Sequence, residues 1–350
     1  LKLTRKTDYR IRSVQAGRMA TIKEIADRLG VSISTVSKGL NGATDVSIEL
    51  RQTILDTAVE MGYVTKRMKK EEHRKLCLFI ENMKYEAAGD FGYDIVLGFR
   101  QAAFRDNWRV EVLPVTPGFQ AQEKYDTFML KNGYSGAFLV GFALQDPWME
   151  QLQDTGIATA LFDNFVWKNP NVAYIGTDSF EGIDTAILHL QELGHKKIAF
   201  LNGSLHSMIT ECRQEAFYDS MEAHGLKVDP EMVANGYYVA ESAKDFVPAF
   251  VERGATAIVC GNDLLAYGVL KECERLHKRV PEDISVIGFD DLPMSAVTAP
   301  PLTTIRQERA ELGKCGYMAL HSLMNHVSIS KTLLRPAFIK RKSTAKAVDR

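Results

Sequence analysis

The stretch MATIKEIADRLGVSISTVSKGLNG, residues 19–42, holds two amphipathic runs separated by one Gly-Val-Ser elbow. Thr21 and Glu24 have the spacing of a capping box, which begins a helix by satisfying its first backbone N–H groups. The apolar residues of the first run recur at the spacing of one helical face: Ile22, Ile25, Ala26 and Leu29. Gly30 then suits the left-handed conformation of a tight turn. The stretch therefore predicts a helix, a turn and a second helix.

The second run, ISTVSKGL at residues 33–40, is expected to form a helix capped by Ser32. Helical spacing turns Val36 and Leu40 toward a core. The other face then carries Ile33, Ser34, Ser37 and Lys38. A further helical run, SIELRQTILDTAVEMGY at residues 47–63, predicts a third helix and completes a small domain.

The outward face of the second helix is short, polar and basic. Small side chains allow close approach to a DNA major groove, and a cation such as Lys38 binds guanine or phosphate. The pattern favours a helix-turn-helix DNA-binding domain. A purely structural hairpin is the alternative, because any two amphipathic helices joined by glycine can form one.

Charge is distributed unevenly along the chain. The 350 residues carry a net charge of -1, yet residues 1–75 hold 16 Lys and Arg against 9 Asp and Glu, a net charge of +7. The remaining 27 basic and 35 acidic residues give residues 76–350 a net charge of -8. The basic end is where a polyanion such as DNA would bind.

Composition excludes several classes of protein. No apolar run approaches the length of a membrane span, and no apolar stretch near the amino end resembles a signal peptide, so we expect a cytoplasmic protein without membrane contact. The five cysteines are scattered without a Cys-x-x-Cys pair, which predicts reduced thiols and no metal site. No nucleotide-binding or hydrolase motif is present, so we expect no cofactor.

Beyond residue 75, short apolar runs alternate with helical runs, as in KLCLFIE (75–81) and DIVLGFRQAAFRDN (94–107). Such alternation is typical of parallel sheets with helices on both faces, and the number of runs predicts two Rossmann-like lobes. Several of these runs end in polar residues, among them Asp163, Asn262, Asp263 and Asp290. Because ligands of open parallel sheets bind beyond the carboxyl ends of the strands, these side chains are expected to meet in one cleft.

The amino-terminal motif resembles the headpiece of the LacI/GalR family of transcriptional repressors. The resemblance rests on TIKEIADRLGVSISTVSKGLNG and its continuation VSIELRQTILDTAVEMGY. It implies that Ile33, Ser34 and Lys38 read bases. It also implies that five residues contact the DNA backbone: Thr21, Thr35, Ser37, Asn41 and Ser47. Lys38 stands where the family usually has arginine, and a lysine lacks the fork that discriminates guanine.

The carboxyl-terminal part resembles the effector domain of the same family, through LGHKKIAFL, GNDLLAYG, ISVIGFDDLP, PPLTTIRQ and RKST. The resemblance implies a periplasmic-binding-protein fold of two lobes joined by three crossovers. It also implies effector-binding roles for Asp163, Arg213, Asn262, Asp263, Asp290 and Gln307. Arg213 would grip a hydroxyl pair or a carboxylate, and the acids would accept hydrogen bonds from sugar hydroxyls.

Each of these effector residues has a structural alternative. An Asp or Asn at a strand end often caps the next helix, and a buried Arg often closes an ion pair. Phe162, Trp148 and Trp167 could stack on a sugar ring or could pack in the core. His195 is interpreted as a turn residue without chemistry.

The expected fold is α/β, with a three-helix helix-turn-helix headpiece followed by a two-lobed domain of parallel sheets. Residues 1–18 are expected to be a disordered extension, 19–64 the DNA-binding domain, 65–75 a basic linker and 76–347 the effector-binding and dimerisation domain. Lobe 1 is expected at about 76–176 plus 307–335, and lobe 2 at about 177–306 plus 336–347.

The expected function is that of a homodimeric transcriptional repressor. It would bind a pseudo-palindromic double-stranded operator, under the control of a mono- or disaccharide effector. Two alternatives from other classes stay open: a cytoplasmic sugar-binding protein without operator recognition, and a sugar-acting enzyme.

The linker TKRMKKEEHRK, residues 65–75, differs from the family pattern, in which a hinge helix wedges a leucine into the minor groove. Here six basic residues and one apolar residue, Met68, take its place. We expect a charged tether with weak operator bending and strong salt dependence, with Met68 as the alternative wedge.

Overall fold

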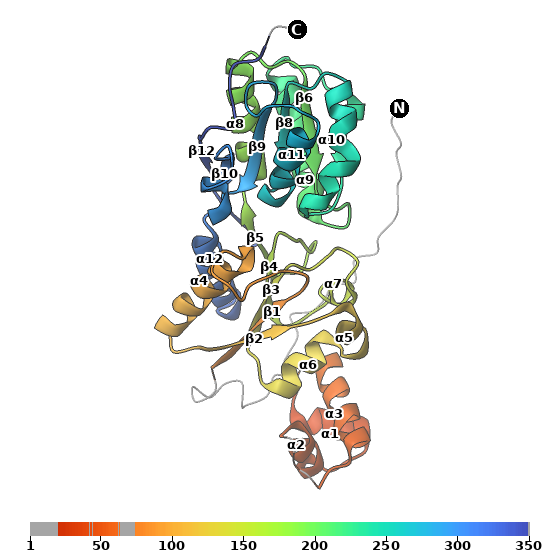
Figure 1. Ribbon diagram of the computed structural model, residues 1–350. Helices are drawn as coiled ribbons and strands as arrows, with labels where there is room; N and C mark the ends of the chain where they lie inside the picture. The colour runs from red at the N-terminus through yellow and green to blue at the C-terminus, as the bar shows by residue number, and fades with distance from the viewer. Residues whose placement is uncertain (1–19, 42, 44, 62, 64–73, 349–350) are drawn as a thin grey trace. The chain divides into compact units, whose positions relative to one another are not determined.

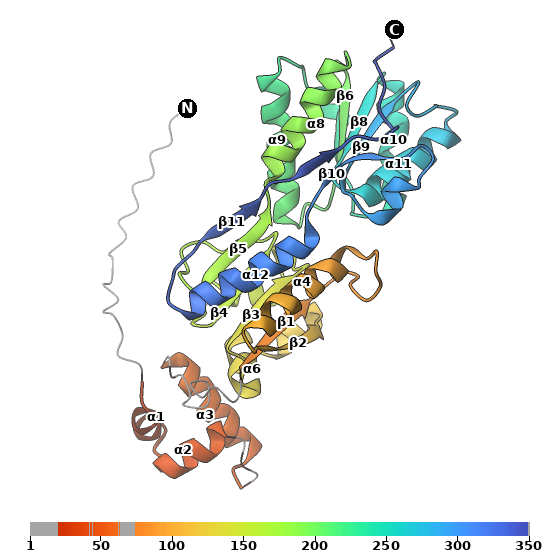
Figure 2. The same cartoon turned by 90° about the vertical axis from the view of Figure 1, so that its left-hand side faces the viewer.

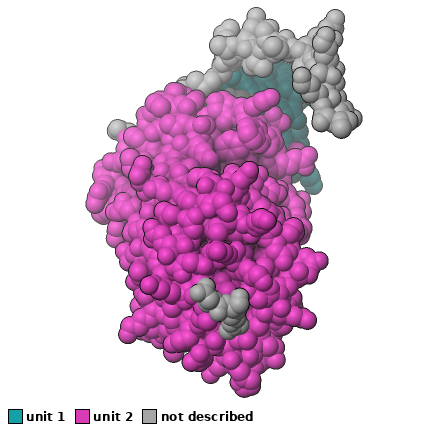
Figure 3. Space-filling view, turned by 90° about the horizontal axis from the view of Figure 1, so that it is seen from above, with its two compact units in different colours: residues 1–70 teal, residues 71–350 magenta. Residues whose placement is uncertain are grey.

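The computed structural model describes residues 20–348 except 42, 44, 62 and 64–73. These residues fall into two compact units, within residues 1–70 and 71–350 (Figure 3). The expected extension at 1–18 and Met68, with most of the expected linker, lie outside the described residues. In the described part of the chain, no helix is long and apolar enough to cross a membrane.

The first unit contains the three helices α1 (Ile22–Leu29), α2 (Ile33–Leu40) and α3 (Ile48–Glu60). The predicted capping box is present, with Thr21 accepting from the backbone N of Glu24, and Gly30 ends α1 in the left-handed conformation at φ 66°. A small apolar core joins the helices and consists of Ile25, Ala26, Val36, Ile54, Leu55 and Ala58. Three short helices thereby bury one side of each and leave the other side to solvent.

The second unit contains two sheets of six strands each (Figures 1 and 2). Lobe 1, as used from here on, is the sheet β11-β5-β4-β3-β1-β2 with its helices. Its strands are β1 (Lys75–Ile80), β2 (Arg109–Pro114), β3 (Gly136–Val140), β4 (Ala158–Phe162), β5 (Val172–Thr177) and β11 (Lys331–Leu334). Its helices are α4 (Phe91–Arg105), α5 (Pro117–Gln122), α6 (Tyr125–Asn132), α7 (Pro147–Gln151) and α12 (Arg309–Met324).

Lobe 2 is the sheet β12-β10-β9-β8-β6-β7 with its helices. Its strands are β6 (Ile198–Asn202), β7 (Val233–Asn235), β8 (Ala257–Cys260), β9 (Ser285–Asp290), β10 (Thr303–Arg306) and β12 (Ala337–Ile339). Its α-helices are α8 (Ser179–Glu192), α9 (Met208–Ala223), α10 (Ala243–Glu252) and α11 (Asp263–Arg275). Short 3₁₀ turns lie at Pro230–Met232, Ala240–Ser242 and Pro293–Ala296.

Alternation along the strands supplies a core on each face of each sheet. In β1, Leu76, Leu78 and Ile80 join the cluster beneath α4 and α12. Cys77 and Phe79 point to the opposite face and join the cluster beneath α6 and α7. Strands that are buried on both faces are continuous apolar runs in sequence, which is why KLCLFI was recognisable as a strand.

The strands pair in parallel except for β12, which runs antiparallel to β10. The chain passes between the two sheets three times, after β5, after β10 and after β11. Because all the parallel strands of a sheet end at the same edge, the residues after β4, β8, β9 and β10 lie at the edges where the lobes are connected. This arrangement determines the position of the candidate effector site.

Candidate DNA-binding and effector sites

The second helix of the headpiece presents an open first turn. Ser32 caps α2 by accepting from the backbone N of Thr35 at 3.0 Å, and the two hydroxyl oxygens lie 2.8 Å apart. Ser34 is exposed, and the side chain of Ile33 is 52% exposed although it is large and apolar. An apolar residue on the solvent face of a short, capped helix suits contact with a thymine methyl group in the major groove.

The residues expected to contact the DNA backbone lie mostly at helix ends. Thr21 caps α1, and Ser47 caps α3 by accepting from the backbone N of Leu50 at 3.2 Å. Asn41 ends α2 and donates through Nδ2 to the backbone O of Ser37 at 2.7 Å. Thr21 and Ser47 thus lie at helix amino ends, where phosphate contacts commonly form.

Lys38 lies in the last turn of α2, where its ammonium forms an ion pair with the carboxylate of Asp45. Both side chains are about half exposed, at 51% and 55%. Hydrogen bonding to Lys38 lowers the pKa of Asp45. No motif in the sequence marks Asp45 as a functional residue.

Arg213 of α9 is the central cation of the second unit. Its guanidinium lies over the ring of Phe289 at 3.9 Å, and Nη1 donates to the backbone O of Gly261 at 2.6 Å. The residue is 3% exposed, so its orientation is held on several sides. Its Nε has no hydrogen-bond partner among the described residues. The side chain is therefore fixed in position, and its Nε–H is available to donate to a ligand.

Two carboxylates lie within electrostatic range of Arg213. Burial raises the pKa of Asp163, the residue after β4, to about 7, and the charge of Arg213 opposes this rise. Burial also raises the pKa of Asp290 at the end of β9, again against Arg213. Asp290 Oδ1 accepts from Gln307 Nε2 at 2.7 Å. Both carboxylates are thus buried and interact with the charge of Arg213, and Asp290 interacts also with that of Arg309.

The backbone at both carboxylates is strained. Asp163 has φ 50° and Asp290 has φ 121°, both in the region that L-residues with a side chain rarely adopt. Strain of this kind persists where the surrounding structure imposes it and is concentrated at functional sites.

Several buried polar atoms at or just after the ends of β4, β5 and β10, and on α9, lack hydrogen-bond partners. Among the described residues, these atoms are Asp163 Oδ1, Thr177 Oγ1, Ser179 Oγ, Arg213 Nε and Gln307 Oε1. Buried polar groups in native proteins nearly always find a partner, so unpaired donors and acceptors indicate positions that a ligand or ordered water fills. The set contains both donors and acceptors, which is what hydroxyl groups require.

Comparison with known proteins gives matches to both units. Residues 21–66 match the family of bacterial regulatory proteins, lacI family, and residues 187–344 match the periplasmic binding protein-like domain. The HTH-type transcriptional regulator MalR of Streptomyces coelicolor is 28% identical over 344 residues, which cover 93% of this chain and 97% of MalR. The HTH-type transcriptional repressor PurR of Pasteurella multocida is 26% identical over 336 residues, which cover 93% of this chain and 98% of PurR.

The amino-terminal domain belongs to the lacI family of bacterial regulatory proteins. The fold of the chain is that of a lac repressor dimer solved with operator and the anti-inducer ONPF, with a TM-score of 0.66, 23% identity and coverage of 94% of this chain and 100% of that one. A CelR–cellobiose complex matches with a TM-score of 0.69 and 22% identity, over 93% of this chain and 99% of that one. The chain thus joins a lacI-family DNA-binding domain to a periplasmic-binding-protein-like domain, and the relatives that match it over nearly its whole length are transcriptional regulators.

Two of the expected effector residues, Asn262 and Asp263, accept hydrogen bonds from other groups of lobe 2. Asp263 is fully buried, and its carboxylate accepts from the backbone N of Leu292 at 2.8 Å and from the hydroxyls of Ser295 and Thr304, each at 2.6 Å. Its oxygens hold the loop after β9, and the expectation that Asp263 binds effector stays a prediction. Asn262 caps α11 by accepting from the backbone N of Leu265 at 2.9 Å, which is the structural alternative considered above.

The three aromatic residues that could stack on a sugar ring differ in burial. Trp148 is fully buried and donates through Nε1 to the backbone O of Glu123 at 2.7 Å, so it belongs to the core of lobe 1. Phe162 is 4% exposed and lies 6.0 Å from the ring of Phe91. Trp167 is 73% exposed and contacts Phe165 edge to face. His195 is buried and bonds Thr256 Oγ1 and the backbone O of Ala345, which is a structural role.

Two residues of the candidate effector site were not expected from the sequence. The ring of Phe289 lies 3.9 Å from the guanidinium of Arg213, and the hydroxyl of Tyr238 lies 2.7 Å from Thr210 Oγ1, with the charges of Arg213 and Asp163 acting on it. Phe289 could have been found from its position beside Asp290. Tyr238 gave no signal, because its loop has no motif or periodicity.

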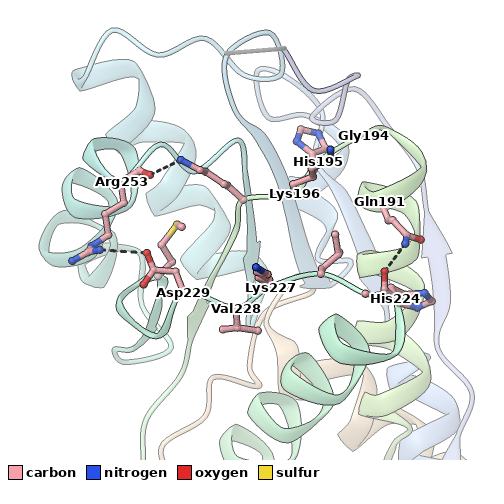
Figure 4. A pocket seen from close by; sticks show the side chains of 13 residues that line it. Gln191, Gly194, His195, Lys196, His224, Lys227, Val228, Asp229 and Arg253 are labelled. Carbon is pink, nitrogen blue, oxygen red and sulfur yellow. Dashed lines mark hydrogen bonds and ion pairs between the residues drawn. The ribbon is translucent and has the colours of Figure 1, made fainter.

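A surface hollow of about 680 Å³ lies at the opposite end of lobe 2, before β6 (Figure 4). Its rim includes Lys196, Lys197 and Lys227, and Arg253 bonds Asp229 there at 3.3 Å. The carboxyl ends of α8 and α9 border it, and helix carboxyl ends attract cations. The carboxyl ends of α8 and α9 therefore account for the lysines at this hollow, and we assign no ligand to it.

Proposed function

We propose that this LacI-family protein is a cytoplasmic, homodimeric repressor, not an enzyme, whose affinity for a pseudo-palindromic operator is controlled by a mono- or disaccharide. The effector is proposed to bind Asp163, Arg213, Asp290 and Gln307. The observation that carries the proposal is that Arg213, whose Nε is unpaired among the described residues, interacts by charge with the buried carboxylates of Asp163 and Asp290. The solved relatives described as complexes with cellobiose and ONPF support this class of effector.

The headpiece is proposed to bind the operator through Ile33, Ser34 and Lys38 on base edges, with Thr21, Thr35, Ser37, Asn41 and Ser47 on the backbone. The match of residues 21–66 to the lacI family and the exposed first turn of α2 support these roles. Two headpieces of a dimer would read the two halves of the operator.

We predict that Lys38→Ala weakens operator binding by about 1–3 kcal/mol and relaxes the preference at one base position, because the variant loses a cation at a base edge. The operator is first selected from a random duplex pool with the full chain, and affinities are then measured by fluorescence anisotropy. Lys23→Ala, an exposed lysine of α1, is the matched control for loss of charge. Equal operator affinity of Lys38→Ala and wild type would remove Lys38 from the reading face.

We predict that Arg213→Ala abolishes the effector response and leaves operator binding without effector intact. A thermal-shift screen of mono- and disaccharides on the wild-type chain first identifies a stabilising sugar, which is then tested on the variant. Arg213→Lys is the second variant in case the alanine variant unfolds, since lysine keeps the charge without the planar fork. A full response in a folded variant would exclude Arg213 from the site.

A further inference from the structure

The ion pair between Lys38 and Asp45 lies on the surface that carries the proposed base-reading residues. Lys38 belongs to α2, and Asp45 lies between α2 and α3, two residues before the cap Ser47. Both charged groups are about half exposed, so neither is held there by burial. A carboxylate on a DNA-binding surface is unfavourable by itself, because every phosphate repels it.

The pair changes what the ammonium of Lys38 can bind. A lysine ammonium has three donors, so it can keep Asp45 as one partner and still donate to the O6 and N7 acceptors of a guanine. Because a guanine edge carries no net charge, the carboxylate of Asp45 does not repel it. A phosphate that approaches the same ammonium brings a negative charge within the screening length of Asp45, which opposes the contact.

We propose that Asp45 is a specificity-determining residue. It holds the Lys38 ammonium in an ion pair without net charge, which can still bind a base edge but attracts a phosphate less than a free ammonium does. This inference rests on the proposed operator-binding function of the headpiece. Asp45 then lowers affinity for DNA of any sequence more than it lowers affinity for the operator. The gain is in the ratio of specific to non-specific binding, which decides how a regulator is distributed over a genome.

The test compares wild type with Asp45→Asn in the full chain, on the selected operator and on a scrambled duplex of the same composition. Asp45→Asn should raise affinity for the scrambled duplex by at least about threefold, with a smaller rise on the operator, so the specificity ratio falls. The log–log salt slope on the scrambled duplex should steepen by about 0.9, because Lys38 is free to take one phosphate.

Two controls isolate the role of the pair. Asp27→Asn removes an exposed carboxylate from α1 and should leave the salt slope unchanged, although it alters the net charge equally. In a Lys38→Ala background, Asp45→Asn should also leave the slope unchanged, because no ammonium remains there to take a phosphate.

Three results would overturn the inference. Unchanged affinities and slopes in Asp45→Asn would mean that the pair is only a solvated surface contact. Weaker operator binding with unchanged scrambled binding would mean that Asp45 itself contacts a base. If wild type enriches no sequence and binds operator and scrambled duplex equally, the proposed function fails and the inference fails with it, a result visible without any variant.

Discussion

Single side chains determine the chemistry of the effector site. Asp163 combines burial, a positive φ and an oxygen that has no hydrogen-bond partner in the part of the chain that the structure describes, and the Nε donor of Arg213 is likewise unpaired there. The charge of Arg213 is the main influence that favours the ionised form of Asp163. A ligand that donates hydrogen bonds to this carboxylate would act in the same direction, so binding and ionisation are linked.

We predict from this linkage that effector affinity rises with pH. The pKa of Asp163 is raised to about 7, so the carboxyl is mostly protonated at pH 6 and mostly ionised at pH 8. If sugar hydroxyls donate to the ionised form, affinity increases by up to about tenfold over this range, and binding releases protons. Calorimetry in buffers of different ionisation enthalpy measures both effects.

Asp163→Asn is the control for this pH dependence. The variant should bind the sugar more weakly, with an affinity that changes little between pH 6 and pH 8. The same pH dependence in wild type and Asp163→Asn would assign the titration to another group.

At the scale of elements, α4 and α12 of lobe 1 pack closely against each other. Gly98 of α4 and Gly313 of α12 allow it, because a Cβ at Gly98 would lie 2.0 Å from the backbone O of Ala310. A Cβ at Gly313 would lie 2.0 Å from the backbone O of Ile95. The backbones of the two helices therefore lie in contact. Helix α12 directly follows the second of the three crossovers, after β10.

We predict that Gly313→Ala lowers the free energy of unfolding by at least about 2 kcal/mol, since a backbone must shift to admit the methyl group. Denaturant unfolding followed by circular dichroism measures the loss. Gly156→Ala is the matched control, because a Cβ there meets no atom within 4 Å among the described residues. Equal losses in the two variants would contradict the close-packing argument.

At the scale of the whole second unit, hydrogen bonds of Arg309 and of Leu144 connect the two lobes. Arg309, at the start of α12, donates to Asp94 of α4 in lobe 1 at 3.1 Å and to the backbone O atoms of Asp290 and Asp291 in lobe 2 at 3.0 and 3.3 Å. The backbone N of Leu144 in lobe 1 donates to the O of His206 in lobe 2 at 3.0 Å. Arg309 donates to the backbone at the end of β9, which carries Asp290. It therefore connects the lobe 2 part of the proposed effector site to α4 of lobe 1.

We predict that Arg309→Met reduces the effect of effector on operator affinity by at least about threefold, because the lobes lose this link. The ratio of operator affinities with and without the sugar measures the coupling. Arg335→Met is the matched control, since Arg335 pairs with Glu181 at 3.5 Å but is 88% exposed. Unchanged coupling in Arg309→Met would exclude this arginine from the communication between sites.

Sequence alone determined the elements whose signals are local. The capping box at Thr21, the left-handed turn at Gly30 and the cap at Ser32 each lie within a few residues, and all three appear in the structure. The continuous apolar runs predicted β1 and most other central strands for the same reason. The short edge strands β7, β11 and β12 carry too few apolar residues to be recognised this way.

Only the tertiary structure decided which polar residues do what. Asp163, Asp263 and Asp290 are alike in sequence, each at a strand end. Asp263 alone receives three donors, which come from residues 292, 295 and 304. The pairing of Lys38 with Asp45 and the seat of Arg213 over Phe289 depend equally on chain segments that folding brings together. Secondary structure follows from neighbours along the chain, whereas the charge state and free hydrogen-bonding capacity of a side chain follow from neighbours in space.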